Sequence, residues 1–262
     1  MTSVFKKLLN MRHDFSQLLP AQGLVSFIGG GGKSGFMERV EEERHKQGLV
    51  SLVTVSTRLG RWQFPALEHV EALSENEARA ALKKAGEGRR VLLAGPPAED
   101  DLRLNKYNGI PSAWFSGLKA GLPPSGLILI EADGSAGLPV KAHRAGEPPL
   151  PFETDFMVGI VGLSALKMPW AETIHRPEFF AEYCPLPLEK RPLKPGELAG
   201  FILKAWSSLN IDLLFFNQLD LLGNEYAVLL EQLLKALNGF PSAVVLGSLK
   251  DGFYCLPGVK HN

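Results

Sequence analysis

Short apolar runs alternate along the chain with longer segments of mixed polarity. Seven such runs, rich in leucine and β-branched residues, occur at 24–28, 50–55, 91–94, 127–130, 156–161, 213–216 and 243–246. Strands that are apolar on both faces are typical of a parallel sheet that helices cover on both sides. The pattern therefore predicts an α/β fold, with a doubly wound and mostly parallel sheet at the centre of a three-layer sandwich.

The segments between these runs differ in character. The clearest helix is expected from Asn224 to Gly239, where leucines recur at helical spacing. Two proline-rich stretches, 139–151 and 177–195, are predicted to run over the surface as loops, because proline interrupts helices and central strands. They are candidates for covering a ligand site.

Length and composition bound the possible classes of protein. A chain of 262 residues is expected to form a single domain over 1–262. With 28 basic and 28 acidic residues the net charge is zero, so neither nucleic acid nor a membrane surface is an expected partner. Charges interrupt the apolar positions of residues 1–19, which predicts a cytoplasmic protein without a signal peptide. Cys184 and Cys255 are expected to be ordinary thiols.

The first apolar run ends in a glycine-rich loop. Its residues are Gly29, Gly30, Gly31, Gly32, Lys33, Ser34 and Gly35. Glycines let backbone N–H groups fold closely around an anion, and a helix starting near Lys33 adds the positive end of its dipole. The pattern predicts nucleoside triphosphate binding, with Lys33 at the terminal phosphates and Ser34 on a bridging Mg²⁺. A glycine-rich turn without a ligand is the alternative.

The spacing of this loop departs from the full Walker A motif. Phe27 stands six places before the lysine, where that motif has a glycine. Ile28 stands where some P-loop ATPases with a compressed loop carry a second lysine. The sequence thus indicates a compressed P-loop variant without that second lysine.

A second chemical motif follows the apolar run 127–130. It ends in Glu131 and Asp133, an arrangement similar to Walker B. Ligands in open α/β sheets lie beyond the carboxyl ends of the strands, so these carboxylates are expected to face the glycine-rich loop and hold magnesium. Which acid binds the metal and which orients the attacking group stays open, as does the alternative of a simple turn.

Two further strand ends carry polar residues. Ser56, Thr57 and Arg58 follow the second run, and Arg58 is a candidate for stabilising charge on a transferred phosphoryl group. Asn217 and Asp220 follow the sixth run and resemble the Asn-Lys-x-Asp motif of GTPases, with Gln218 in place of the lysine. Local hydrogen bonding explains hydroxyl and Asn/Asp residues at such positions equally well, so a guanine preference stays open.

Together these residues resemble the YqeC-like family of accessory proteins for selenium-dependent molybdenum hydroxylases. The resemblance covers most of the chain and rests on 29–34, 56–57, 131–135 with 137–141, 147–148, 175–178 and 217–220. The family pattern often has Thr at Ser34, His at Arg58 and Lys at Gln218. The resemblance implies a P-loop NTPase-like fold and a role in maturing a molybdenum enzyme.

The sequence therefore favours a Mg²⁺-dependent protein that binds ATP or GTP and hydrolyses or transfers its γ-phosphoryl group. Lys33, Arg58, Glu131 and Asp133 are the candidate catalytic residues, with the amides of 30–32 at the phosphates. Residues expected at a second substrate are Ser56, Thr57, Lys141, Arg144, His175 and Arg176. A nucleotide-gated chaperone or adaptor with negligible turnover and a small-molecule kinase are the alternatives. The base, the acceptor or client, the involvement of selenium and the oligomeric state stay open.

Overall fold

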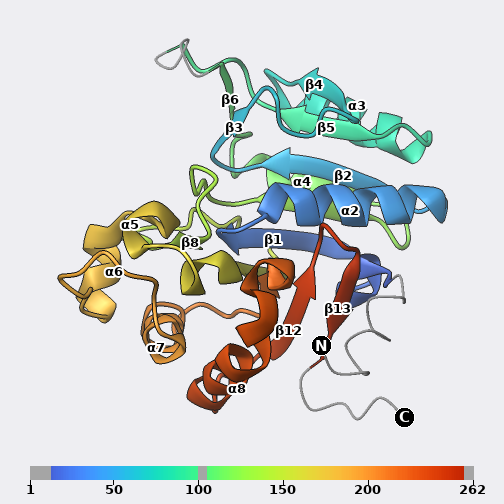
Figure 1. Ribbon diagram of the computed structural model, residues 1–262. Coiled ribbons are helices and arrows are strands. Elements are labelled where there is room, and N and C mark those ends of the chain that lie inside the picture. Colours follow the sequence, from blue (N-terminus) through green and yellow to red (C-terminus); the bar gives the residue numbers. More distant parts are fainter. Residues whose placement is uncertain (1–12, 100–104, 257–262) are drawn as a thin grey trace.

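A nine-stranded sheet organises the part of the chain that the computed structural model describes, residues 13–99 and 105–256 (Figure 1). Its strands are β1 (Gly23–Gly29), β2 (Ser51–Val55), β4 (Glu68–Glu71), β5 (Val91–Ala94), β7 (Leu127–Glu131), β9 (Phe156–Gly162), β11 (Leu213–Asn217), β12 (Ala243–Ser248) and β13 (Phe253–Cys255). Their spatial order is β13-β12-β11-β9-β1-β7-β2-β5-β4. Neighbouring strands pair in parallel except at one edge, where β13 runs antiparallel to β12. The predicted α/β class is confirmed.

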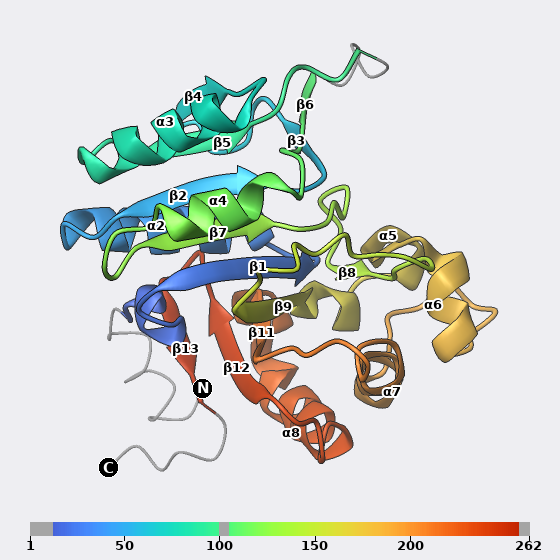
Figure 2. The same cartoon turned by 180° about the vertical axis from the view of Figure 1, so that it is seen from behind.

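Helices cover both faces of this sheet. One face carries α2 (Lys33–Lys46) and the short 3-10 helix η1 (Phe15–Leu18), while α3 (Glu75–Gly86), α4 (Trp114–Ala120), α7 (Pro195–Ala205) and α8 (Tyr226–Ala236) cover the other. Figures 1 and 2 show α2 and α4 on opposite sides of β1, β2 and β7. The alternation along β11 fits this arrangement, because Phe215 packs into the α2 cluster and Phe216 into the α7 and α8 cluster. The fold is therefore the predicted three-layer sandwich.

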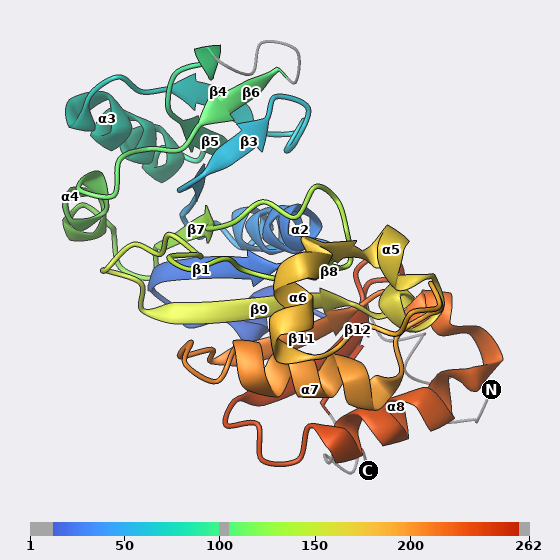
Figure 3. The same ribbon diagram turned by 90° about the vertical axis from the view of Figure 1, so that its left-hand side faces the viewer.

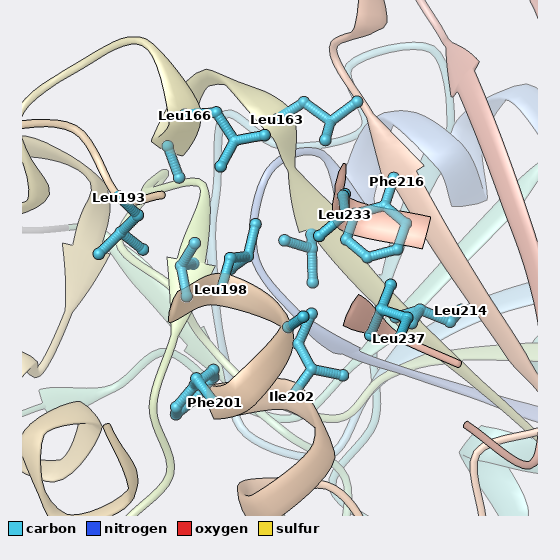
Figure 4. Packing of buried hydrophobic residues seen from close by; sticks show 14 of the residues in the cluster. Leu163, Leu166, Leu193, Leu198, Phe201, Ile202, Leu214, Phe216, Leu233 and Leu237 are labelled. Atoms are coloured by element: carbon cyan, nitrogen blue, oxygen red, sulfur yellow. The ribbon is translucent and has the colours of Figure 1, made fainter. Parts of the chain in front are cut away.

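The largest apolar cluster lies between α7, α8 and the strands β9 and β11. Figure 4 shows Ile202 of α7, Leu233 and Leu237 of α8, and Phe216 of β11 converging there. Leu233 and Leu237 belong to the leucine pattern that predicted the final helix, although α8 begins at Tyr226 after the 3-10 helix η4 (Leu219–Glu225). Among the described residues, no helix combines the length and apolarity needed to cross a lipid bilayer.

Several short strands and helices lie at the carboxyl edge of the sheet. They are β3 (Arg58–Gly60) paired with β6 (Lys106–Asn108), β8 (Val140–Lys141) paired with β10 (Ile174–His175), and the helices η3 (Leu163–Leu166), α5 (Trp170–Thr173) and α6 (Pro177–Tyr183). Figures 1 and 2 place β8, α5 and α6 at the end of the molecule toward which β1 points, and Figure 3 shows α6 in front of the sheet when this end faces the viewer. These elements surround the candidate site.

The proline-rich stretches do not follow the predicted loop assignment throughout. Pro177 is the first residue of α6 and Pro195 the first of α7, a position where proline costs no hydrogen bond and where its fixed φ suits a helix. The prediction of a loop over 177–195 is therefore wrong for 177–183 and for Pro195. The stretch 139–151 is irregular apart from the two residues of β8, and its residues Lys141, Arg144 and Glu147 line a cavity.

Candidate functional site

The glycine-rich loop connects the end of β1 to the start of α2. Gly29, Gly31 and Gly32 have φ values of 95°, 79° and 126°, which side chains rarely tolerate. The helix begins at Lys33, as predicted, and its first backbone hydrogen bond runs from the amide of Phe36 to the carbonyl of Gly32 over 2.9 Å. The amides of residues 33–35 therefore have no intrahelical acceptor.

The amides earlier in the loop are used within the protein. Gly29 N–H donates to Asp133 Oδ2 over 2.9 Å, Gly30 N–H to the carbonyl of Ile160 over 2.8 Å, and Gly31 N–H to the carbonyl of Leu138 over 3.0 Å. The sequence predicts that the amides of residues 30–32 lie at the phosphates. In this structure the amides of Gly30 and Gly31 instead bind the carbonyls of Ile160 and Leu138, and the amides without an intrahelical acceptor are those of residues 33–35 at the N-terminus of α2.

Lys33 and Asp133 form a buried ion pair beside this loop. Lys33 Nζ lies 2.9 Å from Asp133 Oδ1, and the two side chains are only 2% and 1% exposed. Lys33 Nζ also donates to the carbonyl of Gly29 over 2.6 Å. An ammonium group has three donors, so one N–H of Lys33 remains for a further acceptor.

Several groups stabilise the negative charge of Asp133. His143 Nε2 lies 2.6 Å from Asp133 Oδ2, and Lys141 Nζ lies 3.9 Å from the same oxygen. Burial alone would raise the pKa of Asp133, but the charge of Lys33, the hydrogen bond from His143 and the charge of Lys141 outweigh it. The pKa of Asp133 is consequently held well below its ordinary value. Its Oδ2 takes part in hydrogen bonds with Gly29 N–H and His143, whereas its buried Oδ1 has the ion pair with Lys33 and no hydrogen-bond partner among the described residues.

Glu131 stands in a different environment. The hydroxyl of Ser34 donates to Glu131 Oε2 over 2.8 Å, and Gln63 Nε2 donates to Ser34 Oγ over 2.7 Å. Burial raises the pKa of Glu131, and the nearby Asp133 raises it further, while the charge of Lys33 and the hydrogen bond from Ser34 partly oppose this. The carboxylate and hydroxyl oxygens at this point are the hard ligands that Mg²⁺ prefers.

Two neighbouring cavities open at this edge of the sheet. The first, here called the loop cavity, has a volume of about 380 Å³ and is lined by the glycine-rich loop together with Glu131, Trp62 and Gln63. The second, here called the basic cavity, has a volume of about 860 Å³. Its charged and ionisable lining residues are Arg58, Lys106, Asp133, Lys141, Arg144, Glu147, His175 and Arg176. The two cavities share Arg58, Lys106, Gly134 and Ala136, so they adjoin.

Three cations gather around one carboxylate in the basic cavity. Glu147 Oε2 lies 2.5 Å from Arg176 Nη1 and 3.5 Å from Lys141 Nζ, and Glu147 Oε1 lies 3.0 Å from Arg144 Nε. Burial would raise the pKa of Glu147, but these partners lower it. Burial lowers the pKa of His175, and the charges of Lys141 and Arg176 lower it further.

Of the remaining sequence candidates, Ser56, Asn217 and Asp220 have local hydrogen-bond partners, whereas the buried Thr57 Oγ1 has none among the described residues. Ser56 Oγ donates to the carbonyl of Pro149 over 3.1 Å and lines neither cavity, whereas Thr57 lines the basic cavity. Asn217 Nδ2 donates to the carbonyl of Gly31 over 2.7 Å, and Asn217 Oδ1 accepts from Leu249 N over 3.0 Å. Asp220 accepts from Ser248 Oγ over 2.9 Å. Asn217 thus clamps the glycine-rich loop to the segment after β12.

Three residues of the site were missed by the sequence reasoning. His143 contacts Asp133, Gln63 contacts Ser34, and Glu147 collects the three cations. The sequence held one signal for His143, which lies two places after the candidate Lys141. In the structure both side chains approach Asp133. Gln63 precedes a buried phenylalanine in a segment without chemical pattern, and only the tertiary fold brings it to the loop.

The fold and this site define a three-layer α/β protein with a lysine-bearing glycine loop at the carboxyl edge of a parallel sheet. A model of the YqeC protein family matches residues 25–178 of the chain, which is more than half of its length. The chain belongs to the YqeC family. The match includes the glycine-rich loop, Glu131, Asp133 and the basic cavity, but it ends before Asn217 and Asp220. No curated protein matches the chain.

Proposed function

We propose that the protein binds a nucleoside triphosphate with Mg²⁺ in the loop cavity and acts as an accessory factor in the maturation of a molybdenum hydroxylase. The observation that carries the proposal is the convergence of Lys33, Ser34, Glu131 and the first amides of α2 on one cavity. Family membership supports the accessory role, which the YqeC resemblance implies.

The electrostatics of the loop cavity suit a polyphosphate. The N-terminus of a 14-residue helix favours an anion through its unpaired amides and its dipole. Lys33 keeps one donor for a phosphate oxygen, and its ion pair with Asp133 fixes the ammonium at the base of the cavity. In this arrangement Asp133 positions Lys33, and the phosphate charge is met by Lys33 and the amides of residues 33–35.

The donor set also fits magnesium. Mg²⁺ is usually bound by one or two carboxylates, phosphate oxygens and water, so it does not require a complete cage of protein ligands. Among the described residues no group of three or more His, Cys, Asp or Glu side chains is placed to hold a metal. Ser34 and Glu131 would therefore hold the ion jointly with the phosphates. Glu131 is preferred over Asp133 because Glu131 contacts Ser34 and lines the loop cavity, whereas Asp133 lines the basic cavity and pairs with Lys33. Bound Mg²⁺ would neutralise phosphate charge, and Ser34 and Glu131 would orient it.

Phosphoryl transfer in such a site depends on positioning and charge stabilisation. Arg58 lines both cavities, which suits a residue that stabilises charge between a triphosphate and an acceptor. The acceptor is either water, as in an NTPase, or a second substrate in the adjoining basic cavity, as in a small-molecule kinase. The size and charge of the basic cavity support the small-molecule kinase as a second candidate function.

The central test is calorimetric titration of ATP and GTP with Mg²⁺ into the wild-type protein, Ser34→Ala and Glu131→Gln. We expect binding by the wild type and a weaker magnesium dependence in both variants. Arg191→Met is the matched control, because Arg191 pairs with Glu197 outside both cavities. Absence of nucleotide binding by the wild-type protein would refute the proposal. Capture of an apo-molybdenum hydroxylase only in the presence of nucleotide, without phosphate release, would favour the adaptor over the NTPase.

A further inference from the structure

The basic cavity has more positive charge at its centre than its own carboxylate neutralises. Lys141, Arg144 and Arg176 all lie within 3.5 Å of Glu147, so three cations share one negative charge. Asp133 does not remove this excess, because its charge is already balanced by Lys33 at 2.9 Å. The group around Glu147 therefore carries a net charge of two positive units.

This excess charge lies inside a cavity and is partly desolvated. The Lys141 side chain is 3% exposed and that of Glu147 14% exposed, and both line the 860 Å³ cavity. Removing cations from water without full neutralisation is costly, which favours a site that completes its charge balance with a ligand. Arg144 is more exposed, at 63%, and stands where an incoming molecule would meet it.

The donors around Glu147 are only partly used. Arg176 contacts it through Nη1 and Arg144 through Nε, and a guanidinium group presents five N–H donors. Planar guanidinium groups recognise phosphate oxygens through paired hydrogen bonds. The three cations thus line the cavity with N–H donors that Glu147 does not use.

Backbone conformation marks the same place. Arg176 and Ala136 have φ values of 64° and 52°, in the left-handed region that side chains other than glycine seldom occupy. Both residues line the basic cavity. Residues held in such conformations concentrate at binding and catalytic sites, where the surrounding structure compensates their cost.

We propose that the basic cavity binds a small organic phosphate monoester as the second substrate, held by Lys141, Arg144 and Arg176 opposite Glu147. A phosphate monoester carries close to two negative charges at neutral pH, which matches the excess of two positive charges. The shared wall at Arg58, Lys106, Gly134 and Ala136 places this ligand next to the loop cavity. The inference that an anion binds here does not require nucleotide binding, whereas the role of second substrate rests on the proposed function.

The test is calorimetric titration of glycerol 3-phosphate, with glycerol as the uncharged comparison, into wild-type protein and five variants, one of which is Ser34→Ala from the loop cavity. We expect Arg144→Met and Arg176→Met each to weaken glycerol 3-phosphate binding about tenfold, the loss typical of a charge-assisted hydrogen bond. Glu147→Gln is expected to tighten it severalfold, because the substitution removes the competing negative charge. Arg191→Met is expected to leave it unchanged.

The Glu147→Gln result separates recognition from folding, since a purely structural Glu147 would give weaker or unchanged binding, and that result would count against the proposed competition between Glu147 and the phosphate. Circular dichroism melts check that each variant is folded. The inference is overturned if the wild type does not bind glycerol 3-phosphate, or if Ser34→Ala weakens this binding while Arg144→Met and Arg176→Met do not. If nucleotides fail to bind but glycerol 3-phosphate binds with the expected dependence on the variants, the proposed function falls and the anion site stands.

Discussion

The ion pair between Lys33 and Asp133 gives the sharpest quantitative prediction. The two groups are 2.9 Å apart and almost completely buried. At an effective dielectric constant of about 20, their attraction is roughly 6 kcal/mol, most of which is offset by the cost of removing both charges from water. Removing one partner alone leaves a buried charge behind and typically costs about 3–5 kcal/mol.

The surroundings of the pair predict which single substitution costs more. In Lys33→Met, Asp133 would still accept from Gly29 N–H and His143 and would still lie near Lys141. In Asp133→Asn, Lys33 would lose its paired counter-ion, because the carbonyl of Gly29 and the amide oxygen of the new side chain can accept from it but carry no charge. We therefore expect losses in the free energy of unfolding of about 3 kcal/mol for Lys33→Met and about 5 kcal/mol for Asp133→Asn.

The assay is a double-mutant cycle measured by urea denaturation at neutral pH. The double variant is expected to lose at least about 2 kcal/mol less than the sum of the two single losses, because it buries no unpaired charge. Additive losses, or single losses below about 1 kcal/mol, would refute the argument. The double variant also serves nucleotide titrations, since a folded protein without Lys33 separates lost phosphate binding from lost stability.

Three further predictions follow from other contacts. The stability difference between wild type and Asp133→Asn should be largest above the ordinary aspartate pKa of 3.8 and should shrink as the pH falls below it, because the pKa of Asp133 is lowered in the folded state. Urea denaturation between pH 3 and pH 7 measures this difference, and a difference that does not change with pH would contradict the argument. Leu233→Ala should lower the free energy of unfolding by about 2–5 kcal/mol and Val228→Ala by less than about 0.5 kcal/mol, because Leu233 is fully buried and Val228 is 59% exposed on the same helix; equal losses would contradict the core assignment. Asn217→Ala should weaken the binding of all nucleoside triphosphates to the same extent, because the Asn217 side chain donates a hydrogen bond to the carbonyl of Gly31 and so positions the glycine-rich loop. Thermal-shift profiles that change for one base only would contradict this role.

The seven central strands were predictable because each is a continuous apolar run buried on both faces. β4 and β13 escaped this reasoning for physical reasons. β4 reads Glu-His-Val-Glu and is only half buried at one edge of the sheet, and β13 has three residues at the other edge. Edge strands face solvent and do not need apolar side chains on both faces, so their sequences lack the pattern of central strands.

The grouping of the site was predictable, but the division of labour within it was not. The rule that ligands lie beyond the carboxyl ends of parallel strands brought Lys33, Glu131 and Asp133 to one edge. The sequence could not distinguish the carboxylate that contacts Ser34 from the one that contacts Lys33, because side-chain directions depend on the tertiary fold. The contacts of His143 and Glu147 similarly depend on the loop that follows Asp133 returning to the sheet.

The glycines themselves have a second explanation, which leads to the last prediction. A Cβ atom on Gly30 would lie 2.3 Å from the carbonyl oxygen of Leu138 and 2.9 Å from the backbone of Pro139. Gly30 has no positive φ, so the requirement for glycine at position 30 comes from this close backbone contact and not from the backbone conformation. The contact ties the glycine-rich loop to the segment that continues into Lys141, and hence joins the walls of the two cavities.

Gly30→Ala should therefore weaken both glycerol 3-phosphate and nucleotide binding, because the clash displaces the 138–139 segment along with the loop. Gly196→Ala is the matched control, since a Cβ there meets no atom within 4 Å and lies in helix α7. We expect the control to bind both ligands normally and to be as stable as the wild type or slightly more stable. If Gly30→Ala lost nucleotide binding alone, the two cavities would be mechanically independent, and the glycines would serve the phosphate only.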